Sequence, residues 1–197
     1  MTLLANALAC ERNGRVVFSG LSFEVGEGRC AELRGPNGSG KSSLLRLIAG
    51  LLPASHGTLS LTGQEAIPQA CHFIAHQEAM KSALTVSENL EFWSAMLGGQ
   101  NIVTALAAFA LEPLRNEQAA ILSAGQRRRL TLSRLFLAKR IVWLLDEPTT
   151  ALDRDSVGIL RKHMQNHLAG GGIILTAAHD DVLKIPAATI SLGNAAS

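Results

Sequence analysis

The fold of this chain follows from one stretch, Gly35-Pro36-Asn37-Gly38-Ser39-Gly40-Lys41-Ser42. Its three glycines allow a tight turn whose backbone N–H groups point toward an anion. An apolar strand is expected before the loop, over Arg29–Arg34, and a helix after it, over Lys41–Ala49. A glycine-rich loop between a strand and a helix is the Walker A arrangement, which binds nucleotide phosphates. The sequence therefore predicts an α/β nucleotide-binding fold.

Each residue type in this loop has a chemical task. We expect Lys41 to reach the β- and γ-phosphates and the Ser42 hydroxyl to bind Mg²⁺. The positive end of the following helix favours the same anion. The expected ATP-binding residues of the loop are Gly35, Pro36, Asn37, Gly38, Ser39, Gly40, Lys41, Ser42 and Ser43.

An acidic pair follows the longest apolar strand signal. Ile141–Leu145 is a continuous apolar run, typical of a parallel strand covered on both faces, and Asp146 and Glu147 come directly after it. An aspartate at the carboxyl end of such a strand suits the Walker B role of holding Mg²⁺. Glu147, one residue further on, is the expected general base for the attacking water.

The remaining elements are predicted from alternation, turn residues and helix caps. Thr85-Val86-Ser87-Glu88 and Ser123-Ala124-Gly125-Gln126 have the form of capping boxes, so each predicts a helix start. The second of these helices is expected to run to Ala138. Another helix is expected over Asp155–Leu168. Further strands are expected at Leu3–Cys10, Val16–Val25, Thr58–Thr62, Cys71–Ala75 and Ile173–Ala177, the last of them ending the core.

Composition narrows the class of protein. A chain of 197 residues with 47% hydrophobic content can form one domain with a sizeable core. The net charge of +2 gives no argument for a nucleic-acid partner. No apolar stretch approaches the roughly 18 residues that span a bilayer, and the start lacks the basic region of a signal peptide. Any membrane role is therefore expected to come through a separate partner chain.

Two groups of polar residues are expected to have no special role. The basic run Arg127-Arg128-Arg129 is expected on a solvated helix face. The pairs His72/His76 and His163/His167 each have i, i+4 spacing, but a metal site needs a third ligand and none is evident. These histidines are expected to be packed or solvated.

A second motif, Leu122-Ser123-Ala124-Gly125-Gln126, gives the chain its family resemblance. With this motif between the Walker A loop and the acidic pair, the chain resembles the nucleotide-binding domains of ATP-binding cassette (ABC) transporters over essentially its whole length. The resemblance implies an ATPase that uses ATP and Mg²⁺. It implies a P-loop (RecA-like) core, at 1–79 and 139–197, with an N-terminal antiparallel β subdomain. It also implies an inserted α-helical subdomain at 80–138, which carries the signature motif.

The resemblance implies roles at a dimer interface. Ser123, Ala124, Gly125 and Gln126 would contact the ATP held by a second copy of the chain, which forms a homodimer in the ATP state. The family usually has glycine where this sequence has Ala124, a mild change. Asp153, in Ala151-Leu152-Asp153, would lie in the loop that faces the partner across the dimer.

Three further roles are implied near the γ-phosphate. Gln77 would contact Mg²⁺ and link the site to the membrane subunit. His179 would contact the γ-phosphate and orient Glu147. The implied Mg²⁺ ligands are Ser42, Gln77 and Asp146.

The sequence departs from the family where adenine binds. The family usually stacks adenine on an aromatic residue just before the first turn glycine, but this chain has Arg12-Asn13-Gly14 there and no tyrosine at all. The guanidinium of Arg12 can stack on a base, and Phe18 is a second candidate. Both remain open at this point.

Local sequence points to one branch of the family. Cys10-Glu11-Arg12, Phe18–Phe23 and Leu84–Leu90 resemble the ATPase subunits of bacterial cytochrome c biogenesis (haem exporter) complexes. The resemblance implies integral membrane subunits of the CcmB, CcmC and CcmD type as partners, at the cytoplasmic face of the bacterial inner membrane. It also implies ATP-driven release of a haem-loaded chaperone. No direct haem binding is expected, since the chain has no haem-attachment motif.

Other functions remain open. The ATPase of a lipid, lipoprotein or cell-division exporter is the main alternative. A soluble ABC ATPase of DNA repair or chromosome organisation needs a long insertion between Gln77 and Ser123, where only 45 residues lie. A translation-factor type usually carries two cassettes, and a small-molecule kinase needs neither Leu122–Gln126 nor His179.

Overall fold

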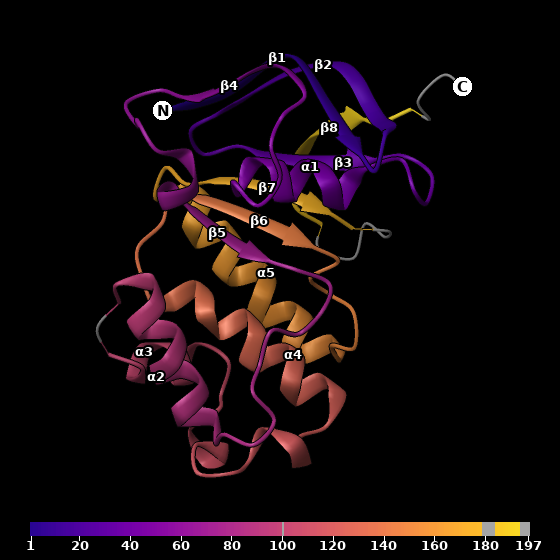
Figure 1. Ribbon diagram of the computed structural model, residues 1–197. Coiled ribbons are helices and arrows are strands. Elements are labelled where there is room, and N and C mark those ends of the chain that lie inside the picture. Colours follow the sequence, from indigo (N-terminus) through magenta and orange to yellow (C-terminus); the bar gives the residue numbers. More distant parts are fainter. Residues whose placement is uncertain (100, 179–183, 194–197) are drawn as a thin grey trace.

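The computed structural model describes residues 1–99, 101–178 and 184–193. Figure 1 shows an antiparallel sheet at the top, a parallel sheet with its helices in the middle, and a helical part at the bottom. This is the α/β fold with an N-terminal antiparallel sheet and a helical part that the sequence predicts.

The antiparallel sheet has the order β2-β1-β4. It consists of β1 (Thr2–Arg12), β2 (Arg15–Gly26) and β4 (His56–Leu61). Asn13 and Gly14 join β1 to β2, and both have positive φ, 51° and 73°. That conformation is typical of a tight hairpin turn. It places Arg12 and Arg15 opposite each other at the end of the hairpin.

The parallel sheet has the order β5-β6-β7-β3-β8, and every neighbouring pair is parallel. Its strands are β3 (Cys30–Arg34), β5 (Cys71–Ile74), β6 (Val142–Asp146), β7 (Ile173–Ala177) and β8 (Ala187–Ser191). All residues of β6 and β7 are buried, as their apolar runs predict. The carboxyl ends of these strands meet at one edge, where open α/β sheets bind ligands.

The expectation that β7 is the last core strand was wrong. β8 follows it and pairs with β3 from Cys30↔Ala187 to Arg34↔Ser191. Only Ile190 of its five residues is buried. An edge strand covered on so little of its surface needs no apolar run, so the sequence contains little signal for it.

Two apolar cores lie on the two faces of the parallel sheet. Helix α1 (Lys41–Ile48) packs between the sheets, in a core that includes Val142 and Leu144. Helix α5 (Arg154–Ala169) covers the other face, in a core that includes Trp143 and Leu145. Successive residues of β6 therefore serve opposite cores, because side chains alternate along a strand.

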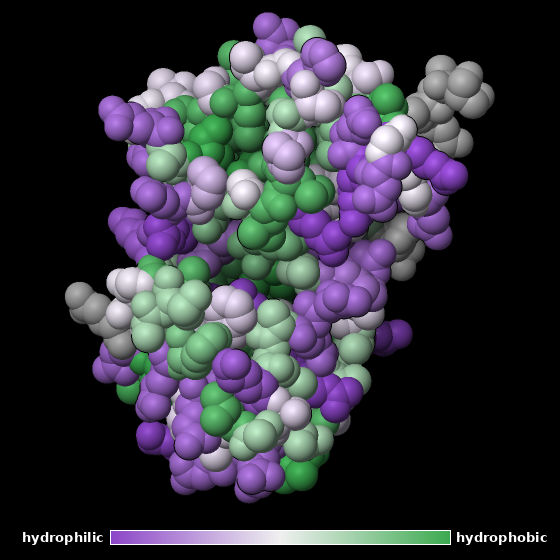
Figure 2. Space-filling view, viewed as in Figure 1, coloured by the Kyte–Doolittle hydropathy of each residue, from purple (hydrophilic) through white to green (hydrophobic). Residues whose placement is uncertain are grey.

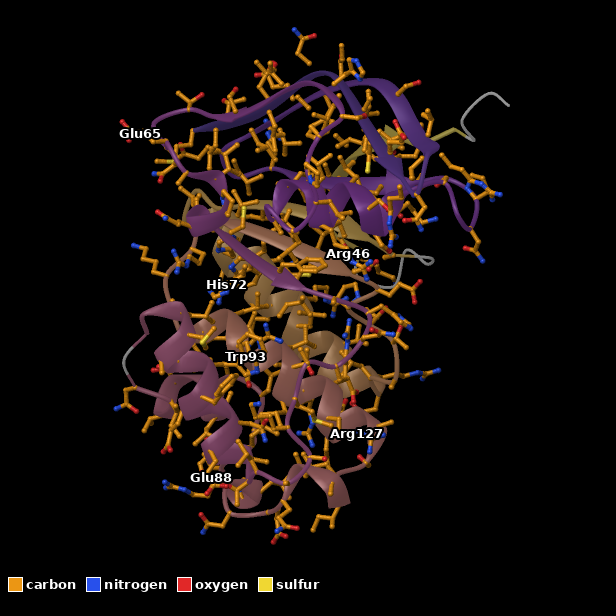
Figure 3. The ribbon with its side chains drawn as sticks, in the orientation of Figure 1. Arg46, Glu65, His72, Glu88, Trp93 and Arg127 are labelled. Carbon is orange, nitrogen blue, oxygen red and sulfur yellow. The ribbon has the colours of Figure 1, made fainter. Side chains whose placement is uncertain are left out.

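The helical part contains α2 (Val86–Leu97), α3 (Val103–Ala108) and α4 (Ala124–Ser133). Both predicted capping boxes are confirmed: Thr85 caps α2 with Glu88, and Ser123 caps α4 with Gln126. Glu88 lies at the lower end of this part in Figure 3. Within the described ranges, no helix combines the length and the apolar content that crossing a lipid bilayer requires.

Helix α4 ends earlier than expected. The α-helix stops at Ser133, and a 3₁₀ turn follows at Arg134–Phe136. The Ser133 hydroxyl donates to the carbonyl of Leu130, 2.8 Å away. Leu135 and Leu137 are both buried, although an α-helix would place residues two apart about 200° around its axis. The tighter turn lets both side chains reach the core, so the prediction of a helix to Ala138 was wrong.

His72 is buried at the junction of the sheet and the helical part (Figure 3), with 3% of its surface exposed. Its Nε2 lies 2.7 Å from the carbonyl oxygen of Ala138. The pKa of this ring is lowered to about 4, chiefly by burial and in smaller part by the nearby Arg140, Arg134 and His167, while the hydrogen bond with Ala138 opposes the shift. His72 is therefore neutral in the folded protein at neutral pH.

We expect the free energy of unfolding to fall as the pH drops from about 6.5 toward 4, because only the unfolded chain readily protonates this ring. The stability that the neutral His72 ring contributes is fully present above the pKa of the unfolded chain. It is lost as the pH falls toward the lower pKa of the folded protein. It amounts to about 2 kcal/mol between pH 7.5 and pH 5. Urea denaturation at about pH 7.5 and pH 5 measures it. His72→Gln is the control, since its amide can donate to Ala138 but does not titrate; an equal loss in both proteins contradicts the prediction.

Candidate active site

A cavity of about 690 Å³ lies at the carboxyl edge of the parallel sheet. Three segments line it: the hairpin end of β1 and β2, the loop before α1, and the end of β6. The structure therefore brings together these residues from the predicted site: Arg12, Asn37, Gly38, Gly40, Lys41, Ser42, Ser43, Asp146 and Glu147. Asn13, Arg15 and Val17 also line the cavity, and the sequence did not predict them.

Close packing explains two of the loop glycines. Gly40 has φ of 99°, and a Cβ there would lie 2.7 Å from Cγ1 of Val17. A Cβ on Gly35 would lie 2.3 Å from the carbonyl oxygen of Leu192. Phe18 also packs behind Gly40 and is only 4% exposed. Of the two candidates for adenine stacking, Phe18 is thus buried and only Arg12 lines the cavity.

The loop fits a group with several anionic oxygens. The first turn of α1 has no side-chain cap, so its N–H groups can bind an anion. The Lys41 ammonium donates to the carbonyls of Gly35 and Pro36, at 2.7 and 3.0 Å. Ser39 is 1% exposed, and within the described residues its hydroxyl has no hydrogen-bond partner. A bound triphosphate would accept hydrogen bonds from the N–H groups of this uncapped helix start.

Hard oxygen donors lie beside this anion site. The Ser42 hydroxyl and the Asp146 carboxylate line the same cavity, and Asp146 is the last residue of β6. Hydroxyl and carboxylate oxygens are the ligands that Mg²⁺ prefers, together with substrate phosphates. These residues therefore fit a magnesium–nucleotide complex.

Glu147 is held in an unusual backbone conformation. Its φ is 48°, a left-handed value that costs a residue with a Cβ about 1–3 kcal/mol. Its N–H donates to the carbonyl of Ala177 at 2.7 Å. One carboxylate oxygen, Oε2, lies 3.0 Å from Nδ1 of His76 and 3.4 Å from the Thr150 hydroxyl. Strain of this kind persists where the surroundings fix a functional residue.

Arg128 is the main residue that fixes this segment, and it corrects the expectation for the basic run. Its side chain is not solvated but 2% exposed. Its guanidinium donates to the carbonyls of Asp146 and Glu147 at 3.0 and 2.7 Å, and to that of Ala75 at 2.9 Å. Burial lowers its pKa, which the carboxylates of Glu78, Asp146 and Glu147 oppose. One side chain thus joins the ends of β5 and β6.

Gln77 is exposed just beyond the end of β5, and it is not among the residues that line the cavity. The loop after it is fastened to the helical part. Arg127 pairs with Glu78 at 3.1 Å, and both Arg127 and Trp93 are labelled in Figure 3. The contacts of the loop are Trp93 Nε1 to the Ala79 carbonyl, at 2.9 Å, and the Asn89 side chain to both backbone groups of Lys81, at 2.8 and 3.0 Å.

The signature residues Ser123–Gln126 lie elsewhere on the molecule. They form the start of α4, which Figure 1 shows in the lower part, away from α1, and they do not line the cavity. A Cβ on Gly125 would lie 3.0 Å from the carbonyl of Ala151, so glycine lets α4 approach that loop. Asp153, at the end of the loop, caps α5 by accepting from the Ser156 N–H at 2.8 Å, which lowers its pKa. His179 lies outside the described residues.

A phosphate loop between β3 and α1, facing an acidic pair at the end of β6, defines a P-loop nucleotide-binding protein. Residues 18–150 match the sequence profile of the family described as ABC transporter. A putative ABC transporter ATP-binding protein from Pyrococcus furiosus has the same fold, with a TM-score of 0.83, 22% identity and 98% of each chain covered.

Relatives closer in sequence carry a more specific name, cytochrome c biogenesis ATP-binding export protein CcmA. The protein from Nitrobacter winogradskyi is 50% identical over 100% of both chains. That from Bradyrhizobium diazoefficiens is 48% identical over 91% of this chain and 92% of its own. The chain therefore belongs to the ABC transporter family and, within it, to the CcmA family of cytochrome c biogenesis ATP-binding export proteins.

Besides the three cavity residues named above, sequence reasoning missed two residues that contact Glu147. His76 was grouped with His72 by spacing, but its place beside Gln77 at the end of a strand was the more useful signal. The basic run alone predicts a solvated side chain for Arg128. Charge alone does not show which of the three arginines is buried.

Proposed function

We propose that this chain hydrolyses ATP to drive an export complex in c-type cytochrome biogenesis. Identity of 50% to a cytochrome c biogenesis ATP-binding export protein, over the full length of both chains, carries this proposal. The cavity supports it, because phosphate-binding, metal-binding and basic residues line one space. The cargo proposed is haem or a haem-loaded chaperone, handled by other subunits, with no haem bound by this chain.

The roles of the residues in the cavity follow from their chemistry. The loop N–H groups and Lys41 bind the triphosphate, and Arg12 lies against the adenine. Ser42, Asp146 and Gln77 hold Mg²⁺, which offsets the charge on the phosphates when bound. Gln77 has to move to take part, since it is exposed outside the cavity.

Glu147 accepts the proton of the attacking water. Its carboxylate lines the cavity and is 31% exposed, so water can reach it. Its backbone is fixed through Arg128 and Ala177. His179 is proposed to contact the γ-phosphate and to orient Glu147.

Two copies of the chain are proposed to bind two ATP molecules between them. The separation of α4 from the phosphate loop supports this, because Ser123–Gln126 do not line their own cavity. In the dimer they contact the nucleotide of the other copy through the N–H groups at a helix start. Asp153 lies at the same interface.

The helical part, 80–138, is proposed to bind the membrane subunits. The remainder of the chain, 1–79 and 139–197, is proposed to bind nucleotide. Exposed apolar side chains support the first proposal: Phe92, Met96, Val103 and Ile121 are 37–68% exposed. Figure 2 shows apolar residues among polar ones on this lower part. The proposed partners are subunits of the CcmB, CcmC and CcmD type, at the cytoplasmic face of the bacterial inner membrane. Asn89 and Trp93 tie the loop after Gln77 to this surface.

Co-purification tests the proposed partners. A tagged Glu147→Gln variant, solubilised gently from membranes with ATP present, is expected to retain small polytopic cytochrome c maturation subunits, identified by mass spectrometry. The Lys41→Ala variant is the control, since it cannot form an ATP-bound dimer. Recovery of a different permease would keep the ATPase and discard the cytochrome c role. Recovery of no membrane protein would discard the transport role.

A further inference from the structure

His76 meets Glu147 at the edge of the cavity. Its Nδ1 lies 3.0 Å from Oε2 of Glu147, within hydrogen-bonding distance. The two side chains are 55% and 31% exposed, so the contact lies at the surface and not in the core. His76 immediately precedes Gln77, at the start of the loop that is fastened to the helical part.

The backbone on both sides of this contact is fixed by one buried side chain. Arg128 donates to the carbonyl of Ala75, the residue before His76, and to the carbonyl of Glu147 itself. The N–H of Glu147 donates to Ala177, on the neighbouring strand. Exposed ion pairs are usually weak because ordering two long side chains costs entropy. Here the two backbones are already ordered, so less entropy is lost when the side chains meet.

We propose that His76 is a positioning residue for hydrolysis: its Nδ1–H donates to Oε2 of Glu147 and fixes the orientation of the carboxylate. The proposal rests on the proposed role of Glu147 as the general base. A base that is itself oriented by a third group is a recurring arrangement in enzymes, because a small misplacement of a reacting group costs much of the rate.

His76 acts on the rate and not on binding. It is not among the residues that line the cavity, so we expect its loss to leave nucleotide affinity nearly unchanged. It also belongs to the loop that Arg127, Trp93 and Asn89 tie to the helical part. Displacement of that loop would therefore change the orientation of Glu147 directly, through one side chain.

A matched pair of variants tests the proposal. His76→Leu removes the donor, and His76→Asn places an amide N–H near the position of Nδ1. In the full-length protein, His76→Leu is expected to lower kcat by about tenfold, while the Kd for ATP changes by less than about twofold. ATP should hold the His76→Leu protein longer as a dimer in gel filtration, since hydrolysis is slower. His76→Asn is expected to recover most of the rate.

A double-mutant cycle separates positioning from packing. In the Glu147→Gln background, His76→Leu is expected to cause no further loss in single-turnover hydrolysis, because the group it positions is gone. Wild-type kcat in His76→Leu, or equal rates in the Leu and Asn variants, would overturn the proposal. If Glu147→Gln itself hydrolyses ATP at the wild-type rate, the role of Glu147 fails instead. The two failures are thus distinguishable.

Discussion

Glu147→Gln is expected to lower kcat for ATP hydrolysis by a factor of about 10²–10⁴. The amide has nearly the shape of the carboxylate, so it can stay within reach of His76, but it cannot accept a proton from water. ATP affinity should stay near the wild-type value, because the triphosphate is held by the loop and not by Glu147. Nucleotide should therefore remain bound, and a closed dimer should accumulate with ATP. Steady-state hydrolysis and gel filtration measure the two effects.

A control for this variant is available on α2. Glu91 is an exposed glutamate in the helical part, and Glu91→Gln removes the same charge away from the cavity. Its turnover should match that of the wild type. Hydrolysis by Glu147→Gln at the rate of Glu91→Gln would show that Glu147 is not the base.

Lys41→Ala is expected to weaken ATP binding by about 100-fold, which corresponds to about 3 kcal/mol. The Lys41 ammonium now donates to the carbonyls of Gly35 and Pro36, inside the loop that would hold the triphosphate. Without it, the phosphate charges are offset by the loop N–H groups and Mg²⁺ only. Titration calorimetry with ATP measures the loss, and thermal unfolding without nucleotide shows whether the loop still folds.

Lys139→Ala is the matched control for the phosphate loop. Lys139 is exposed and lines a different cavity, so its loss removes one positive charge without touching the nucleotide site. ATP affinity should not change. If Lys41→Ala and Lys139→Ala bind ATP equally well, the loop is not the phosphate site.

The sequence predicted those parts of the site in which the residues that shape the backbone and the residues that do the chemistry lie in one short segment. The phosphate loop needs glycines within a few residues of a lysine, and Asp146 comes directly after an apolar strand. Each pattern lies within ten residues, so it can be read without knowledge of the fold. The helix starts at Thr85 and Ser123 were predicted for the same reason, because a capping box involves only four residues.

The parts that the sequence missed depend on packing between distant segments. Arg128 contacts Ala75 and Glu147, 53 and 19 residues away, and no local pattern distinguishes it from Arg127 or Arg129. Phe18 was a candidate for adenine, but the fold turns its ring into the core behind Gly40. The edge strand β8 lacked an apolar run because neighbours cover so little of it.

Helix α4 carries both a signature residue and the arginine that holds the Glu147 segment. Ser123 caps its first turn. Arg128, about 8 Å further along the axis, donates a hydrogen bond to the carbonyl of Glu147. In a dimer of the proposed kind, the first end would touch one nucleotide and the second would steady the base acting on the other. A ten-residue helix is too short to bend appreciably, so a push on one end would reach the other as a rigid displacement. The two ATP molecules would then not be hydrolysed independently. Loss of one γ-phosphate would shift α4 and so change the position of the base that acts on the other ATP.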